Sequence, residues 1–89
     1  MTLYIFTKND FGILRAIYKR KAVSELVSVS VKTLQEDTKL SSVKIRSTLT
    51  LFLNEKYIKL GFRKVNAKTV YIVEDGINKL KEIMGGEIL

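Results

Sequence analysis

The stretch "LSSVKIRSTLTLFLNEKYIKLG", residues 40–61, decides the fold, because it joins a helix with two different faces to a β-rich segment. One side of the helix is apolar at spacings of three and four residues, with Ile45, Leu49, Phe52 and Leu53. The opposite side has no acid and carries Val43, Arg46, Ser47, Thr50 and Asn54. A face that serves only solvation usually mixes both signs of charge, so this face favours an anionic partner over mere hydration.

The residues around this helix predict where it begins and which structure comes after it. Ser41 or Ser42 can cap its N-terminus with a side-chain oxygen. After Lys56 the pattern changes to two β-rich runs, "YIKLGFRKV" and "KTVYIV", with "NA" between them. These runs predict a hairpin whose tip, around Asn66, is basic.

The N-terminal half predicts two further helices and a short strand. Thr7 and Asp10 have the spacing of a capping box, and the helix that they open should end at Arg20 or Lys21. The run "VSVSV", residues 27–31, alternates as a strand does. Ser30 then caps a short helix that reaches about Lys39.

The C-terminal segment "EDGINKLKEIM" predicts a closing helix that "GG" at 85–86 ends, with one apolar side formed by Ile77, Leu80, Ile83 and Met84. The order is therefore helix, strand, helix, helix, hairpin, helix. We expect one compact α+β domain over residues 1–89. Its parts are a helix-turn-helix at about 31–55, a wing at about 57–73 and a C-terminal helix at about 75–84.

The charge of the chain is concentrated rather than spread. The 16 Lys and Arg exceed the 9 Asp and Glu, which gives a net charge of +7 and a pI near 9.8. Residues 41–70 hold seven cations against Glu55 alone, which makes +6 of that total. This balance favours nucleic acid as the partner, with a membrane surface second. A second basic cluster ends the first helix, where either an anion contact or compensation of the helix dipole would explain Arg15, Lys19, Arg20 and Lys21.

The composition argues against enzyme chemistry. The chain has no Cys and no His, so it lacks a thiolate and the commonest general base and metal ligand at neutral pH. It also shows no glycine-rich phosphate loop, and the adjacent acids Glu36 and Asp37 point in different directions. We expect no enzyme activity and no cofactor. The apolar run "LYIF" is too short for a signal peptide or membrane span, so we expect a cytoplasmic protein without membrane contact.

The stretch "TLQEDTKLSSVKIRSTLTLFLNEKYIKLG" resembles the helix-turn-helix of small winged-helix regulators such as the multiple-antibiotic-resistance regulator family. The segment "IVEDGINKLKEI" resembles the "LTxxGxxLLxxL" that opens the last helix of that family, with Gly76 on the glycine. Three positions depart from the pattern: Asp37 replaces an apolar residue, Val73 replaces a capping threonine, so that Glu74 or Asp75 would cap instead, and Lys56 replaces the glycine that precedes the wing. The resemblance implies a winged helix-turn-helix fold.

In helix-turn-helix docking, the second helix enters the major groove and presents its N-terminal half to the bases. Arg46 is the candidate for reading guanine, because its planar fork matches O6 and N7. Val43 could touch a thymine methyl, and Lys44 lies toward the flank, where it suits a phosphate. The remaining candidates are the hydroxyls Ser42, Ser47 and Thr50 on the helix and the cations Arg63, Lys64 and Lys68 on the wing. For the wing lysines, protection of an edge strand against aggregation is the alternative explanation.

We therefore predict a homodimer that binds double-stranded DNA by sequence, with surplus apolar surface in "LYIF" and the last helix available for association. Two uses fit: a transcriptional regulator, or a partition adaptor on a plasmid or phage genome. Its small size makes the chain similar in type to the adaptors of tubulin-type partition systems, in which a second protein would be a further partner. A protein–protein docking module is the alternative. Structured RNA is disfavoured, because Tyr57, Phe62 and Tyr71 are predicted to lie mostly in the core rather than to stack on bases.

Overall fold

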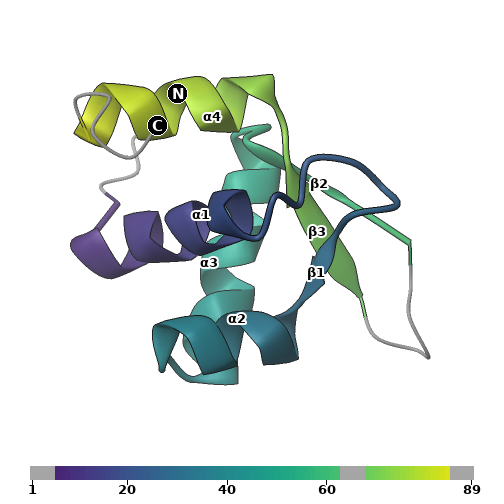
Figure 1. Cartoon of the computed structure of the whole chain (residues 1–89). Helices are drawn as coiled ribbons and strands as arrows, with labels where there is room; N and C mark the ends of the chain where they lie inside the picture. Colours follow the sequence, from purple (N-terminus) through teal and green to yellow (C-terminus); the bar gives the residue numbers. More distant parts are fainter. Residues whose placement is uncertain (1–5, 63–67, 85–89) are drawn as a thin grey trace.

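The structure is a computed structural model that describes residues 6–62 and 68–84. It confirms the α+β winged-helix prediction, because the helices and strands follow one another in the predicted order. Figure 1 shows the sheet on one side of the helices, with α3 passing behind α1 and α4 lying above α1 in this view. The elements are α1 (Lys8–Lys19), β1 (Val29–Ser30), α2 (Val31–Thr38), α3 (Ser42–Asn54), β2 (Ile58–Leu60), β3 (Thr69–Ile72) and α4 (Glu74–Met84).

Side-chain caps begin three of these helices, as the sequence predicts. The Thr7 hydroxyl accepts from Asp10 N–H at 3.3 Å, and the Asp10 carboxylate accepts from Thr7 N–H at 2.8 Å. This reciprocal capping box satisfies N–H groups that the first turn of a helix leaves without partners. Ser30 caps α2, and Ser41 rather than Ser42 caps α3.

The sheet is antiparallel in the order β1-β3-β2, so the short first strand joins the hairpin as a third strand. The predicted strand at 27–31 was too long, because only Val29 and Ser30 pair, opposite Val70 and Thr69. The chain leaves the sheet at Val31, where the Ser30 cap starts α2. Earlier in the run, Ser28 is buried and its hydroxyl donates to Thr69 Oγ1 at 2.8 Å.

The core lies where α1, α3, α4 and the sheet meet. Its largest fully buried side chain is Phe52, on the predicted apolar face of α3, and Ile45 and Leu49 are buried beside it. Phe6 packs on this core, with its ring centroid 5.2 Å from that of Phe52. Phe62 was predicted to lie in the core, and this was wrong: it is 53% exposed. Phe62 lies two residues beyond the end of β2, whose last residue, Leu60, is also 54% exposed.

Among the described residues, three lysines follow helices in the left-handed backbone region: Lys21, Lys39 and Lys56, with φ of 57°, 62° and 62°. Glycine usually takes such positions, because a Cβ makes this conformation cost about 1–2 kcal/mol. Lys56 stands where the resembling family carries glycine. In this chain a lysine adopts there the left-handed backbone that glycine adopts most easily.

Gly76 is required by a close approach between α4 and the start of the hairpin. A Cβ built on Gly76 would collide with the carbonyl oxygen of Tyr57 and lie 2.8 Å from Ile72 Cγ1. The backbone holds this contact, because Val73 N–H donates to the same carbonyl at 3.1 Å. Gly12 is the opposite case, since a Cβ there would meet nothing within 4 Å.

These two glycines provide a matched test of the fold. Gly76→Ala should lower the free energy of unfolding by about 1–3 kcal/mol, because a backbone carbonyl cannot move aside cheaply. Gly12→Ala should raise it by roughly 0.5–1 kcal/mol, because glycine weakens an exposed helix interior. Urea denaturation followed by circular dichroism measures both changes. A Gly76→Ala protein as stable as the wild type would show that α4 and Tyr57 are not packed this closely.

Candidate nucleic-acid interface

The polar face of α3 points to solvent over most of its length. Val43 is 76% exposed, and Arg46, Ser47 and Thr50 are also exposed. The hydroxyls of Ser47 and Thr50 lie close to the helix, because each donates to a backbone carbonyl one turn earlier, at 3.0 Å in both cases. Their oxygens keep lone pairs that can accept hydrogen bonds. The result is a shallow surface on which a nucleic-acid edge can approach the helix closely.

Arg46 is the cation that projects from this surface. Among the described residues it makes no salt bridge, and its side chain lies on the face that has no acid. A guanidinium with five donors and no internal acceptor is available to a planar pair of acceptors such as a guanine edge or a phosphate. Ser42, at the start of the same helix, is half-buried.

Lys44 differs from the other described residues predicted to contact DNA, because its charge is paired within the protein. Its sequence position suggested a phosphate contact, but its ammonium lies 2.6 Å from Asp10 Oδ1 and so already has an internal partner. Its side chain is partly buried between α1 and α3. The positive charge of Lys44 is therefore largely offset within the molecule, whereas that of Arg46 faces outward.

Asp10 is the centre of this internal network. The residue is only 4% exposed, and its carboxylate accepts from Lys44, from Thr7 N–H and from the Thr48 hydroxyl at 3.0 Å. Burial alone would raise the pKa of Asp10, but the hydrogen bonds from Lys44, Thr7 and Thr48 outweigh it and hold the pKa below its usual range. The carboxylate is thus charged at neutral pH, although it is buried.

Sequence reasoning missed Thr48, which is buried on the apolar side of α3. The available signal was its position, three residues after Ile45 and four before Phe52, because a polar side chain inside an apolar arc needs a partner. Asp10 in the first helix had already been assigned to the capping box. The structure shows that the same carboxylate serves both the cap and α3.

The base of the wing is held by hydrogen bonds, but its tip lies outside the described residues. Gly61 N–H donates to the Thr69 carbonyl at 2.8 Å, and the Thr69 hydroxyl donates to the Phe62 carbonyl. Lys68 and Lys59 are exposed on this hairpin. The other two predicted wing contacts, Arg63 and Lys64, fall in the part that is not described.

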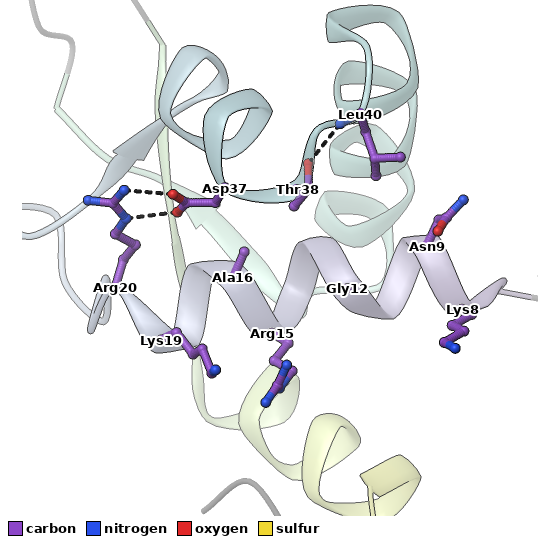
Figure 2. Close-up of a pocket in the computed structure, with 10 residues that line it drawn as sticks. All are labelled: Lys8, Asn9, Gly12, Arg15, Ala16, Lys19, Arg20, Asp37, Thr38 and Leu40. Carbon is purple, nitrogen blue, oxygen red and sulfur yellow. Dashed lines mark hydrogen bonds and ion pairs between the residues drawn. The ribbon is translucent and has the colours of Figure 1, made fainter.

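One residue of the basic cluster at the end of α1 holds α1 and α2 together. Arg20 donates to both oxygens of Asp37, at 2.7 and 2.8 Å, and the hydrogen bond from Arg20 lowers the pKa of Asp37. Figure 2 shows this pair bridging α1 and α2, while Arg15 and Lys19 project from the other side of α1. The pair also explains why Asp37 departs from the resembling family's apolar residue, since here that position forms an ion pair instead of a buried contact.

A groove of about 570 Å³ lies beside the Arg20–Asp37 ion pair, between α1 and the turn that joins α2 to α3. Gly12, Ala16 and Leu40 contribute to its lining, together with the Arg20–Asp37 pair (Figure 2). Arg15, Lys19 and Arg20 of the basic cluster line it, but none of the described α3 and wing residues predicted to contact DNA does. The groove is therefore separate from the outward face of α3.

Two further observations concern the described part of the chain. No group of three or more acids, histidines or cysteines there is arranged to hold a metal ion. Within the same residues, every helix is too short or too polar to pass through a membrane.

The chain is similar, in sequence and in structure, to known DNA-binding proteins. The chain is 36% identical over 77 residues to the DNA-binding protein TubR of a Clostridium botulinum C phage, a match that covers 86% of this chain and 95% of that protein. The solution structure of a DNA-binding TubR fragment from Clostridium botulinum superposes with a TM-score of 0.72 at 34% identity, over 90% of this chain and 99% of the fragment. No family model matches the chain.

The same fold occurs in the regulators that the sequence resembles. ZitR of Lactococcus lactis, a zinc-responsive MarR family member, superposes with a TM-score of 0.72 at 15% identity. The match covers 97% of this chain and 56% of that one. At this identity the likeness concerns the fold, and it confirms the winged-helix resemblance.

The lowered pKa of Asp10 predicts how stability depends on pH. Because the folded-state pKa lies below the unfolded value of about 3.9, the stability from this carboxylate is fully present above about pH 4 and is lost as the pH falls through the folded pKa. Asp10→Asn should therefore be less stable than the wild type at pH 7, and the gap should narrow below about pH 4. Urea denaturation across this range measures it, and a gap independent of pH would contradict the assignment.

Proposed function

The chain belongs to the TubR family of DNA-binding proteins, and from this premise we propose that it binds double-stranded DNA by sequence, as a homodimer. The observation that carries the proposal is the outward face of α3, where Arg46 is exposed and unpaired by any described acid. A family of DNA-binding proteins also agrees with the expectation that the chain is not an enzyme.

In the proposed complex α3 lies in the major groove with its N-terminal half against the base edges. Arg46 pairs with a guanine, Val43 meets a thymine methyl, and the Ser42 hydroxyl donates to a nearby phosphate. Ser47 and Thr50, whose hydroxyl protons go to helix carbonyls, are short enough for the bases to approach closely and can accept from a base amino group. Lys68 and its neighbours on the wing, Arg63 and Lys64, contact the backbone or a minor groove. Lys44 acts through Asp10 in this proposal rather than as a separate phosphate contact.

The biological use that we favour is partition: an adaptor that coats repeated sites on a plasmid or phage genome in the cytoplasm and is bound there by a second protein. The relative from a phage supports this use. Transcriptional regulation is the second candidate, favoured by the fold shared with a MarR family member. Sequencing the DNA that co-purifies with the protein separates the two, because tandem repeats indicate partition and a single promoter palindrome indicates regulation.

Mutations in the recognition helix α3 and in the wing should affect DNA affinity in different ways. Arg46→Ala should cost about 1–3 kcal/mol on the selected site and relax preference at one base position, because a base contact is lost. Lys68→Ala should weaken all sequences about equally and make the slope of log affinity against log salt shallower by about one, because a phosphate contact is lost. Fluorescence anisotropy on specific and scrambled duplexes at two salt concentrations measures both.

An equal loss on both duplexes for Arg46→Ala would make Arg46 a phosphate contact and not a base reader. If the wild type bound neither duplex and Arg46→Ala left the biological activity of the protein unchanged, the protein would be a docking module instead. Both substitutions should leave the fold intact, because both side chains are exposed.

The dimer is proposed from apolar surface at the two ends of the chain. Leu3 and Ile5 lie outside the described residues, and Phe6 packs on the core, so the described part of this surface is Ile83 of α4, which is 39% exposed. A homodimer would place two recognition helices about 34–36 Å apart, one turn of B-DNA. Ile83→Asp should shift sedimentation from dimer to monomer, while Leu26→Asp, at a more exposed apolar residue elsewhere, should not. A wild type that sediments as a monomer with and without DNA would exclude the dimer.

A further inference from the structure

We propose that Asp10 is a positioning residue for DNA reading: a buried carboxylate of α1 that touches no DNA but sets the angle at which α3 presents Arg46. The inference rests on the proposed function, since it concerns how the same helix meets the bases. It assigns a role in sequence discrimination to a residue 38 positions away from its partner Thr48 on the recognition helix.

The geometry is that of a clamp on one helix. Asp10 Oδ1 accepts from two groups of α3, the Lys44 ammonium at 2.6 Å and the Thr48 hydroxyl at 3.0 Å. These residues are four apart, so they lie one above the other on consecutive turns. The other oxygen, Oδ2, accepts from Thr7 N–H at 2.8 Å. One carboxylate therefore ties the first turn of α1 to two turns of α3.

Apolar packing alone would not set this angle as closely. Ile45, Leu49 and Phe52 hold α3 against the core, but apolar contact is non-directional and tolerates small rotations. Hydrogen bonds weaken as their angles and distances depart from a narrow range. Because a buried carboxylate that loses a partner is costly, the helix has one orientation in which both α3 donors are satisfied.

A small rotation of α3 is enough to affect base reading. Side-chain ends lie roughly 5–6 Å from a helix axis, so a rotation of about 10° moves them by about 1 Å. Such a shift breaks the alignment of a bidentate hydrogen bond between Arg46 and a base edge. It changes the long-range attraction between cations and phosphates very little, because that attraction has no comparable directional requirement. Loss of the clamp should therefore reduce discrimination and leave non-specific affinity in place.

The experiment uses the full chain and two duplexes, one selected from a random pool by the wild type and one scrambled. Thr48→Val removes the hydroxyl at nearly constant shape, and Thr48→Ser keeps it as the matched control. Thr48→Val should bind the selected duplex about tenfold more weakly and the scrambled duplex as the wild type does, which corresponds to one lost base contact. Asp10→Asn should lose the same tenfold preference for the selected over the scrambled duplex, because the charge of Lys44, no longer offset by Asp10, acts on both duplexes alike. Thr48→Ser should retain most of the discrimination. All titrations are made well below the melting temperature of each variant, which circular dichroism determines.

Lys44→Met tests the third member of the network. If Lys44 acts through Asp10, this variant should lose discrimination while its salt slope stays equal to that of the wild type. A slope shallower by about one would show that Lys44 binds a phosphate, and would overturn its place in the clamp.

The outcomes separate this inference from the proposed function. A folded Thr48→Val protein with wild-type discrimination would overturn the clamp and leave DNA reading by α3 intact. An equal loss on both duplexes would also overturn it, because Thr48 would then act on general affinity. A wild type that selects no duplex from the pool would overturn sequence reading itself, and the clamp with it.

Discussion

The buried carboxylate of Asp10 is the interaction on which the arrangement of the helices depends. A charge at this depth is unfavourable unless donors surround it, and here three donors come from the N-cap of α1 and from α3. The same group completes the capping box that starts α1. The start of α1 and the orientation of α3 are therefore coupled through one side chain. A change in the capping box of α1 should alter the orientation of α3, and a change in α3 should alter the capping box.

A second ion pair, between Arg20 and Asp37, performs a related task at the opposite end of α1. The helix that it holds, α2, contributes little to the core, since Leu34 is its only fully buried side chain. The bidentate geometry gives direction to a contact that apolar packing would leave loose. Because this pair is largely exposed, solvent screens it, and we regard it as weaker than the Asp10 network. Together the two acids attach both helices of the helix-turn-helix to α1.

The positive charges at the start of α3 therefore have different roles. Of the two cations on α3, Lys44 is directed inward to Asp10 and Arg46 is directed outward. An inward charge adds to rigidity but little to the external field, whereas an outward charge attracts an anionic partner and can form hydrogen bonds with it. A count of positive residues along the sequence treats the two as equal, so it overstates the charge available to DNA at this helix.

The sequence by itself determined the features that depend on neighbouring residues. The caps at Thr7 and Ser30, the restriction of the α3 cap to Ser41 or Ser42, the order of helices and strands, and the outward face with Val43 and Arg46 all follow from local hydrogen bonds and from helical or strand periodicity. These are properties of segments a few residues long, and tertiary contacts did not reverse them. The family pattern added the position of Gly76, for which the structure supplies the cause in the carbonyl of Tyr57.

Only the tertiary structure decided which distant side chains meet. Nothing in the local pattern pairs Asp10 with Thr48 or Arg20 with Asp37, because these partners lie 38 and 17 residues apart. The short β1 and the exposed Phe62 were decided in the same way, because β1 stops where α2 begins and the core does not cover the end of β2 or Phe62 beyond it. The inward direction of Lys44 was also decided by the tertiary structure. A charged side chain on the flank of a helix can face either solvent or a neighbour, and only the packing of α1 against α3 places a buried carboxylate within its reach.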